Sequence, residues 1–353
     1  MLNKTLKLGL SLCLAAGVTL GQQDPPEPAS KPAPKREIKP PVRKPLPTPP
    51  ARVHAMGRDE RKTSERAIAA EPNVAIKLCV SEGSIRINGS ERKEVRVFVR
   101  NGRKFEFRSL EKDPETGKAN WLWIASTSGP GPLSNCLAGD SVDIDLPMGA
   151  SIDLEARTAG AVVDSVKKAA VKIVEGSINL RNITGGVQAS AYQGDVTVES
   201  SSGLIDLSTT TGNILAYDVK PGSVGDLFKA TTRSGQISLD NVVHRQIQAN
   251  SISGSVAFNG RFLNGGIYNF KTSNGEIRML IPEDSACRLV AAYGFGSFDT
   301  AVPIKYETQN VTSGGKNFVG LIGKATGAPL ATVTVTTSSG SIGIRKQTKD
   351  LKL

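Results

Sequence analysis

Apolar and polar residues alternate over most of this chain, and the short alternating runs repeatedly begin just after a glycine. From residue 176 onward a nine-residue unit recurs, and its glycines are evenly spaced: Gly176, Gly185, Gly194, Gly203 and Gly212. The third position of each unit is Ile or Val, and the fifth is Leu, Val or Ala. Residues two apart point to the same face of a strand. Each unit therefore predicts one short strand with a buried face, followed by a turn.

The repeat loosens after residue 220 but returns further along the chain. Later units begin at Gly235, Gly254, Gly266, Gly275 and Gly340. Ser, Thr and Asn precede many of these glycines and suit turns, because their side chains hydrogen-bond the local backbone. Glycine permits the positive φ that a tight turn needs. The pattern contains almost no helical periodicity, so it predicts an all-β fold.

Two arrangements of such strands fit the repeat. In a β-solenoid, two units form one coil of about 18 residues, and coils stack in parallel at ~4.8 Å. In an antiparallel meander, successive units pair as hairpins. The short, regular period favours the solenoid, and we expect one that resembles a right-handed β-helix.

The β region begins before the regular units. Residues 73–155 also alternate, and terminal repeats of such stacks are commonly atypical. We therefore expect one repetitive β-domain over residues 73–346, with atypical strands in 73–155 and the glycine-started repeats in 156–346. Residues 347–353 form a short basic tail.

The N-terminus has the layout of a secretory signal. Lys4 and Lys7 precede an apolar run over residues 8–20, which is too short for a spanning helix. Residues 1–21 are thus predicted to be a signal peptide, and the protein is expected in the periplasm, at the cell surface or outside the cell. The alternative is a retained or lipid anchor near Cys13.

A proline-rich segment follows the predicted signal. Residues 22–50 hold 11 of the 20 prolines, interleaved with Lys and Arg. Such a segment cannot bury a core. Residues 22–72 are therefore predicted to be a disordered spacer, with polyproline II character in the proline-rich part.

The distribution of charged residues limits the kind of partner that the protein can be expected to bind. The formal net charge is +11, of which residues 1–72 contribute +6 (13 Lys/Arg, 7 Asp/Glu) and residues 73–353 contribute +5 (31 and 26). The β region mixes both signs and shows no basic stripe of the kind that nucleic-acid binders carry. Nucleic acid is therefore not an expected partner.

Cysteine use leaves two possibilities open. Removal of the signal leaves Cys79, Cys136 and Cys287. An oxidising compartment permits a disulfide, and Cys79–Cys136 is the candidate pair because both lie early in the β region. The other interpretation is three buried free thiols. No Cys-x-x-Cys pair exists, so redox and zinc motifs are absent from the sequence.

The sequence offers no catalytic constellation. His54 and His244 have no paired-histidine spacing, and we expect His244 in a surface turn. The sixth position of the repeat carries no carboxylate ladder, which argues against a calcium-binding β-roll. Asp140, Asp143 and Asp145 are clustered, either as a cation site or as a solvated face. Trp121 and Trp123 are interpreted as strand residues. We predict no enzyme activity, no metal and no cofactor.

Four segments carry a resemblance to a known family: "TTRSGQISL", "NSISGSVAF", "KTSNGEIRM" and "TTSSGSIGI". Together with "IDLPMGASIDLEARTAG", they resemble the bacterial putative-adhesin family over roughly residues 73–346. The resemblance implies an exported β-solenoid at the cell envelope, and it supplies no functional residues.

These observations lead to one main functional hypothesis and two alternatives. The main one is a non-enzymatic envelope protein, structural or adhesive, that presents a rigid β-stack on a spacer. Its partner would be an envelope polymer, a surface glycan or an envelope protein, with a membrane involved only by proximity or through a retained anchor. The alternatives are a carbohydrate-active β-helix enzyme and a sensor or scaffold domain in envelope-stress signalling.

Overall fold

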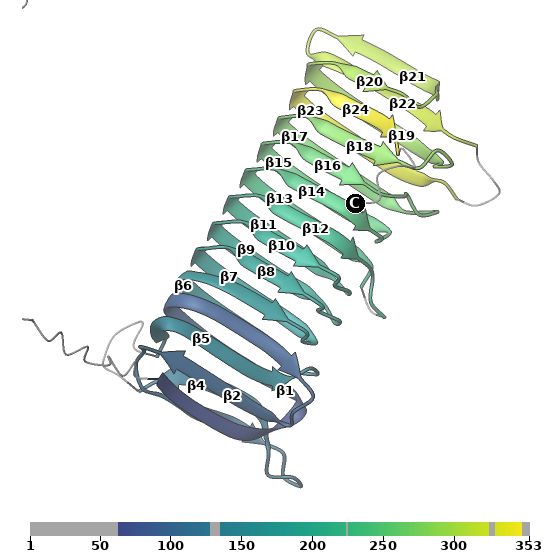
Figure 1. The fold of residues 1–353 in the computed structure, drawn as a ribbon. Helices are drawn as coiled ribbons and strands as arrows, with labels where there is room; N and C mark the ends of the chain where they lie inside the picture. The colour runs from purple at the N-terminus through teal and green to yellow at the C-terminus, as the bar shows by residue number, and fades with distance from the viewer. Residues whose placement is uncertain (1–62, 128–134, 224, 325–328, 348–353) are drawn as a thin grey trace, which may run out of the picture. The chain divides into compact units, whose positions relative to one another are not determined.

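The computed structural model describes residues 63–127, 135–223, 225–324 and 329–347, and these residues form an all-β domain (Figure 1). Within these ranges no helix has the length and apolar character needed to span a lipid bilayer. The predicted signal peptide, residues 22–62 of the predicted spacer and residues 348–353 of the predicted tail lie outside the described residues.

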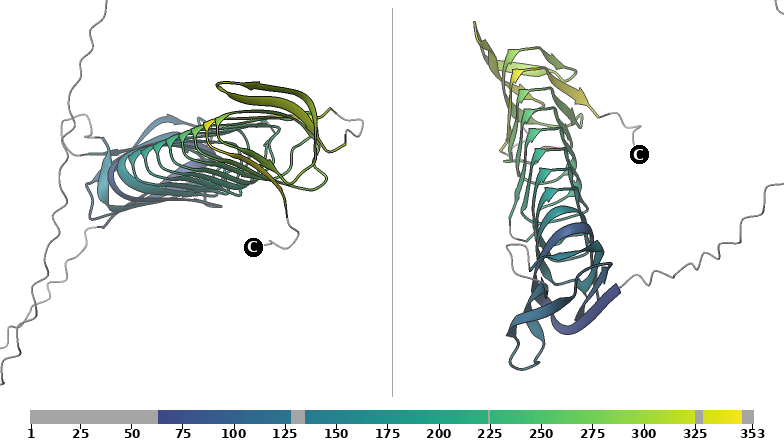
Figure 2. Two further views of the ribbon diagram at one scale, coloured as in Figure 1. Left: turned by 90° about the horizontal axis from the view of Figure 1, so that it is seen from above. Right: turned by 90° about the vertical axis from the view of Figure 1, so that its left-hand side faces the viewer.

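Two sets of strands alternate along the chain and stack as two parallel ladders. The first ladder contains β7 (Lys168–Glu175), β9 (Val187–Gln193), β11 (Ile205–Thr211), β13 (Leu227–Ser234), β15 (Gln246–Ser253), β17 (Ile267–Asn274) and β23 (Ala331–Ser339). The second contains β8 (Ile178–Arg181), β10 (Val196–Glu199), β12 (Ile214–Val219), β14 (Ile237–Val242), β16 (Val256–Asn259), β18 (Ile277–Ile281) and β24 (Ile342–Lys346). One strand of the first ladder and the next strand of the second make one coil, and Figure 2 shows successive coils in line.

The register confirms the all-β, mostly parallel prediction. Val187 pairs with Ile205, so equivalent residues of these two coils are 18 apart, as the repeat predicts. The offset grows to 23 residues between Ile205 and Phe228. It is 19 residues between Phe228 and Ile247. The extra residues lie in the corners and not in the strands, which explains why the repeat loses its phase after residue 220. The antiparallel meander is wrong for these coils.

The apolar positions of the repeat form the core between the two ladders. The residues at the third position are at most 2% exposed: Ile178, Val187, Val196, Ile205 and Ile214. The residues at the fifth position are at most 1% exposed: Leu180, Ala189, Val198, Leu207 and Ala216. Full burial of a Val, Leu or Ile side chain stabilises the fold by about 1.5–3 kcal/mol. Successive units face each other across this core, which is why a single unit has no stable fold of its own.

Alternate glycines of the repeat form a column at one corner of the stack. The Cβ of an alanine at Gly212, where φ is +148°, would lie 2.1 Å from the carbonyl oxygen of Gly194. At each member of the column, an added Cβ would lie 1.9 to 2.2 Å from a carbonyl oxygen of the neighbouring coil. The members are Gly176, Gly194, Gly212, Gly235, Gly254, Gly275, Gly340 and Gly296. Gly185 and Gly203 lie at other corners. Every member of the column must be a glycine because of the short distance between coils, and all of them except Gly275 also have a positive φ that favours glycine.

Buried hydroxyl groups hold the carbonyls of this column. Thr272 is fully buried, and its Oγ1 donates to the carbonyl oxygen of Gly254 at 2.8 Å. Equivalent bonds of 2.9 to 3.1 Å are made by Thr209, Thr232, Ser251 and Thr337. Each donor stands three residues before a column glycine, which gives a physical reason for the Ser and Thr residues that precede the glycines in the sequence.

The N-terminal strands begin the same stack. They are β1 (Thr63–Ser90), β2 (Glu94–Arg100), β3 (Phe105–Lys112), β4 (Ala119–Ser126), β5 (Leu137–Pro147) and β6 (Ser151–Asp164). β1 lies between β6 on one side and β4 and β5 on the other, parallel to all three. The start of β1 corrects the predicted spacer boundary: residues 63–72 are strand, and Thr63–Ala69 pair with β2. Their charges suggested a spacer, but an edge strand tolerates charged side chains because its outer side is solvated.

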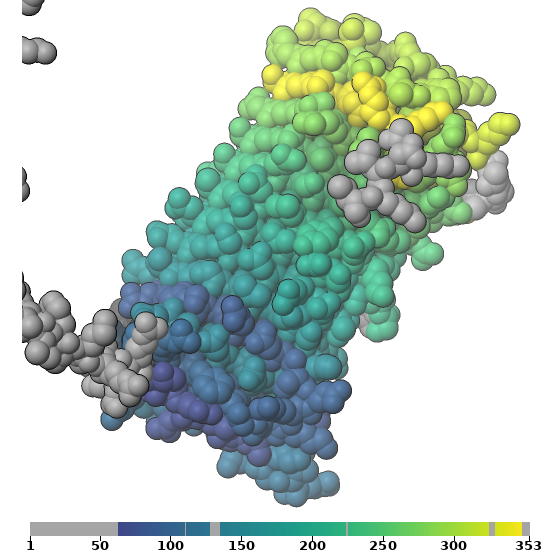
Figure 3. All heavy atoms as spheres, in the orientation of Figure 1, coloured from purple at the N-terminus to yellow at the C-terminus, as the bar shows by residue number. Residues whose placement is uncertain are grey.

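The C-terminal end also departs from sequence order. β19 (Cys287–Phe295) and β20 (Phe298–Thr300) lie at this end of the stack with the hairpin of β21 (Ile304–Thr312) and β22 (Gly315–Ile322). β23 pairs with both β17 and β19, so the last part of the described chain returns into the stack. Figure 3 shows this as a yellow band between the green coils and the yellow-green end.

Candidate functional site

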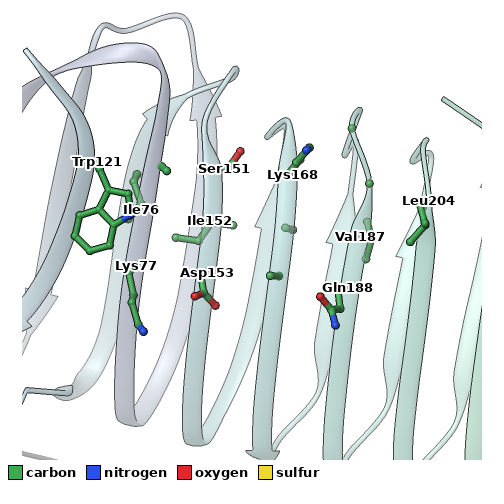
Figure 4. Close-up of a pocket in the computed structure, with 15 residues that line it drawn as sticks. Ile76, Lys77, Trp121, Ser151, Ile152, Asp153, Lys168, Val187, Gln188 and Leu204 are labelled. Atoms are coloured by element: carbon green, nitrogen blue, oxygen red, sulfur yellow. The ribbon is translucent and has the colours of Figure 1, made fainter. Parts of the chain in front are cut away.

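A groove of about 510 Å³ crosses the outward face of the sheet over β4, β1 and β6 and over β7 and β9, the first strands of the first ladder (Figure 4). Trp121 of β4 lies at one end and Leu204, just before β11, at the other. Small residues form much of the floor between them: Ala75, Ala170, Gly185 and Gly186. The groove exists because these positions carry little or no side chain, whereas both ends carry large ones.

Parallel register places the polar residues of the groove in a row. Lys77 pairs with Asp153, Asp153 with Ala170, and Ala170 with Gln188. Directly paired residues in adjacent strands point to the same face of a sheet. A second row runs beside it, because Ser151 pairs with both Ala75 and Lys168.

The polar side chains at this groove have no partner among the residues that the structure describes. Within the described part of the chain, the side chains of Lys77, Asp153, Lys168 and Gln188 form no ion pair and no hydrogen bond. Lys77, Asp153, Lys168 and Gln188 are exposed. Their donors and acceptors are therefore free to meet a ligand.

Away from this groove, polar side chains bind one another from coil to coil: Lys229 pairs with Asp206 at 3.4 Å in the first ladder, and such contacts recur in the second. Asn241 Nδ2 donates to Asp218 at 2.7 Å. The hydroxyl of Tyr217 donates to Glu199 at 3.0 Å, and this bond is the main reason why the pKa of Tyr217 is raised. Such bonds satisfy the polar groups within the protein.

Asp164 of β6 makes similar side-chain contacts with the first strand of the second ladder and the residue that follows it. Burial raises its pKa, but hydrogen bonds from Asn182, Ser165 and Arg181 outweigh that effect, so the pKa lies below the ordinary value. The bond from Arg181 Nε measures 2.8 Å.

A second groove, of about 490 Å³, lies on the outward face of the second ladder. Its charged residues are Asp240, Glu276, Arg278 and Arg345. Each is already engaged: Asp240 accepts from Asn259 at 2.8 Å, Arg278 pairs with Glu276 at 3.0 Å, and Arg345 pairs with Asp299. A ligand here would have to break contacts within the protein.

The two candidate disulfide cysteines lie together. Cys79 of β1 and Cys136, just before β5, are joined by a disulfide with their Cα atoms 4.5 Å apart. The adjoining residues Val80 and Leu137 are register partners, so the parallel pairing of β1 with β5 brings the cysteines into reach. Cys287 is a buried free thiol, and burial raises its pKa to about 12.

The aspartates of the predicted cluster do not converge on one point. Asp143 and Asp145 share the outward face of β5, but their register partners include Arg86 and Arg96 respectively. Asp140 accepts a hydrogen bond from Asn101 at 2.7 Å. In the described ranges no group of three or more His, Cys, Asp or Glu side chains is arranged to hold a metal ion.

The expected surface position of His244 is wrong, because this side chain is fully buried. Its Nε2 lies 2.8 Å from the carbonyl oxygen of Gly203, so Nε2 carries the proton and donates. Nδ1 has no hydrogen-bond partner among the described residues. Burial lowers the pKa of His244, and the Gly203 carbonyl and Asp226 oppose this only partly. His244 lies between β14 and β15, and the centroid of its ring is 5.9 Å from that of Phe228 in β13.

His244 predicts a pH dependence of stability. A histidine whose pKa is lower in the folded protein takes up its proton mainly in the unfolded chain, so the free energy of unfolding should fall as pH drops below about 6.5. Urea unfolding at pH 7.5, 6.5 and 5.5 checks this against His244→Gln, which keeps a donor but does not titrate. The variant should lose less stability over the same interval, and an equal loss in both proteins would refute the assignment.

The sequence predicted that both tryptophans lie in a strand, but it did not predict the groove beside Trp121. Trp121 and Trp123 lie in β4, as expected, and both are partly exposed. Trp123 is covered by the guanidinium of Arg108, 5.1 Å from the ring centroid, whereas Trp121 lines the groove. Lys77, Asp153 and Lys168 were not predicted to meet Trp121. Only the pairing of β1 with both β4 and β6 brings them together, and no local pattern encodes it.

Several solved structures are similar to this chain at low identity. A putative adhesin from Bacteroides fragilis is 12% identical, with 80% of this chain and 97% of that chain covered and a TM-score of 0.39. A putative adhesin from Parabacteroides distasonis is 10% identical, with 82% and 98% covered and a TM-score of 0.37. A putative lipid binding protein from Parabacteroides distasonis is 13% identical, with 81% and 97% covered and a TM-score of 0.25.

No family model matches the chain, and no curated protein matches it. Two of these similar structures bear the name putative adhesin. Identity and TM-score are low for all three structures.

Proposed function

We propose that this protein is an exported, non-enzymatic domain that adheres through the outward face of a β-solenoid to a polymer or protein of the cell envelope. The observation that carries the proposal is the groove between Trp121 and Leu204, whose charged and amide side chains are exposed and have no partner within the described part of the chain. Exposed polar side chains keep any surface soluble, but here they line an apolar trough, where they can also meet the polar groups of a ligand. A binding surface uses them for orientation and specificity.

The architecture supports a role that needs rigidity. Successive coils share one core and one column of close glycine contacts, so the outward face is held in a fixed register over many strands. Stacked repeats of this kind present extended binding surfaces.

Export is supported by two independent features. The N-terminal sequence has the layout of a secretory signal. The Cys79–Cys136 disulfide is a bond that persists in oxidising compartments and is rare in the cytosol. Cell fractionation with mass analysis of the N-terminus tests this part, and full-length protein confined to the cytosol with Met1 intact would contradict it.

The adhesive part is tested with whole protein and three kinds of target. Purified cell-wall polymer, intact cells with their surface glycans, and solubilised envelope proteins are each incubated with the labelled protein. We expect saturable binding to one of them. Absence of binding to all three would overturn the proposal.

The second groove favours one alternative, a carbohydrate-active enzyme. Asp240 and Glu276 are carboxylates in a groove on a β-stack, and sugar-cleaving enzymes use such pairs. The contacts that already engage both residues weigh against this role. Turnover on a panel of polysaccharides that Asp240→Asn or Glu276→Gln abolishes would establish it.

A further inference from the structure

We propose that the groove between Trp121 and Leu204 binds an acidic polysaccharide whose chain runs along the stacking direction of the coils. This inference rests on the proposed function and names the class of partner. It concerns one groove only, so it can fail while adhesion through another surface stands.

The direction of the groove sets the form of the ligand. It crosses β4, β1, β6, β7 and β9 and ends before β11, and each of these strands is paired with the next. Neighbouring strands are ~4.8 Å apart, so five steps span roughly 24 Å. A single small molecule would fill only a part of this length. An extended chain with repeating units fits the repeated spacing of the strands.

The chemistry along the groove matches a sugar chain. Sugar rings have an apolar C–H face, which stacks on an indole, and hydroxyl groups around the ring edge. Trp121 offers the indole at one end, and Ala75 and Ala170 leave a shallow floor for further rings. Asp153 and Gln188 supply the planar oxygen and amide groups that bind hydroxyls, and neither has a partner within the described residues.

The charge of the groove favours an acidic chain. Lys77 and Lys168 contribute two positive charges against the one negative charge of Asp153. Lys167 adjoins the site, because its side chain lies 3.2 Å from the position that a Cβ on Gly185 would occupy. A carboxylate-bearing sugar would therefore gain charge-assisted contacts that a neutral sugar does not.

A lipid is the competing occupant, because the floor is apolar. An acyl chain, however, is commonly enclosed on most of its surface in a binding site. This groove lies on the outward face of a sheet and carries Asp153 in its row of polar groups. The structure therefore favours the sugar chain, and lipid binding becomes an outcome of the test.

The test compares two tryptophans that are two residues apart on one strand. Affinities are measured by calorimetry for three acidic probes (a hexamer of galacturonate, a hyaluronan hexasaccharide and a sialylated oligosaccharide), for a neutral hexamer of glucose, and for decanoate. Trp121→Ala should weaken the binding of the acidic probe at least about tenfold, the loss expected for an aromatic side chain that packs against the ligand. Trp123 is the register partner of Lys77, but its ring is covered by Arg108 and does not line the groove, so Trp123→Ala should change the affinity less than about twofold.

Two further measurements keep the proposal falsifiable if Trp121→Ala folds poorly. Lys168→Gln should reduce the preference for the acidic over the neutral probe several-fold, with the unfolding midpoint unchanged. In Trp123→Phe, Trp121 is the only indole, and its fluorescence should change on saturation with the acidic probe.

The outcomes separate this inference from the proposed function. Equal affinity of Trp121→Ala and the unchanged protein for the acidic probe would overturn the inference and leave adhesion standing. Binding of none of the acidic probes, or Trp121-dependent binding of decanoate alone, would also overturn it. Failure of the proposed function is a separate result, namely no binding to any envelope target.

Discussion

Gly212→Ala is expected to destabilise the domain by roughly 2–6 kcal/mol. A residue other than glycine at φ +148° costs about 1–3 kcal/mol. The added methyl group would lie 2.1 Å from the carbonyl oxygen of Gly194, and such overpacking costs a further 1–3 kcal/mol or so. The clash is with backbone, so relief requires two coils to move apart. Urea unfolding followed by circular dichroism measures the loss.

Gly314→Ala is the matched control. Gly314 lies in the turn between β21 and β22, and a Cβ there would have no atom within 4 Å. The change should shift stability by less than about 0.5 kcal/mol. If both variants unfolded at the same urea concentration as the unchanged protein, the column of glycines would not be the contact that sets the coil spacing.

Loss of the Cys79–Cys136 disulfide is expected to cost about 4 kcal/mol. The bond joins residues separated by 57 positions, and closing a loop of that length removes approximately this much chain entropy from the unfolded state. The variant with Cys79→Ser and Cys136→Ser should unfold at a lower urea concentration. The measurement is repeated with and without dithiothreitol.

The reductant supplies the control for this second prediction. Dithiothreitol should lower the unfolding midpoint of the unchanged protein toward that of the double serine variant, which should itself be insensitive. Cys287 is buried with a raised pKa, so its thiol should not contribute to the effect. If dithiothreitol left the unfolding midpoint of the unchanged protein where it was, the disulfide would add nothing to stability.

The sequence was sufficient for the repeat because each unit encodes its own strand and turn. Alternation at the third and fifth positions predicted which side chains are buried, and Ile178 and Leu180 are examples. Glycine spacing predicted the coil of 18 residues where the corners are short. These features are local, so they can be found without knowledge of what lies above or below each coil.

Features that depend on long-range pairing could not be predicted. The last strands return between β17 and β19, and nothing local to β23 indicates that order. The first ten residues of β1 were assigned to the spacer because their charges resemble those before them. His244 was expected at the surface, since the residues between two repeats cannot be distinguished from a surface loop by their sequence.

The candidate site shows the same limit. Trp121 was recognised as a strand residue, but its neighbours Lys77 and Asp153 are 44 and 32 positions away. Their proximity follows from the position of β1 between β4 and β6. The cysteine pair was identified only as one of two possibilities, and the register of β1 with β5 is what joins it.

The central claim is that successive coils stack in parallel, and one cross-linking measurement tests it most directly. Ser208 of β11 and Thr231 of β13 are register partners on the outward face of the first ladder. Ser208 and Tyr217 of β12 lie on different ladders, although a meander of hairpins would pair their strands. Mild oxidation of Ser208→Cys/Thr231→Cys should give a disulfide, and Ser208→Cys/Tyr217→Cys should give none. Cross-linking of the second pair but not the first would contradict the parallel stack.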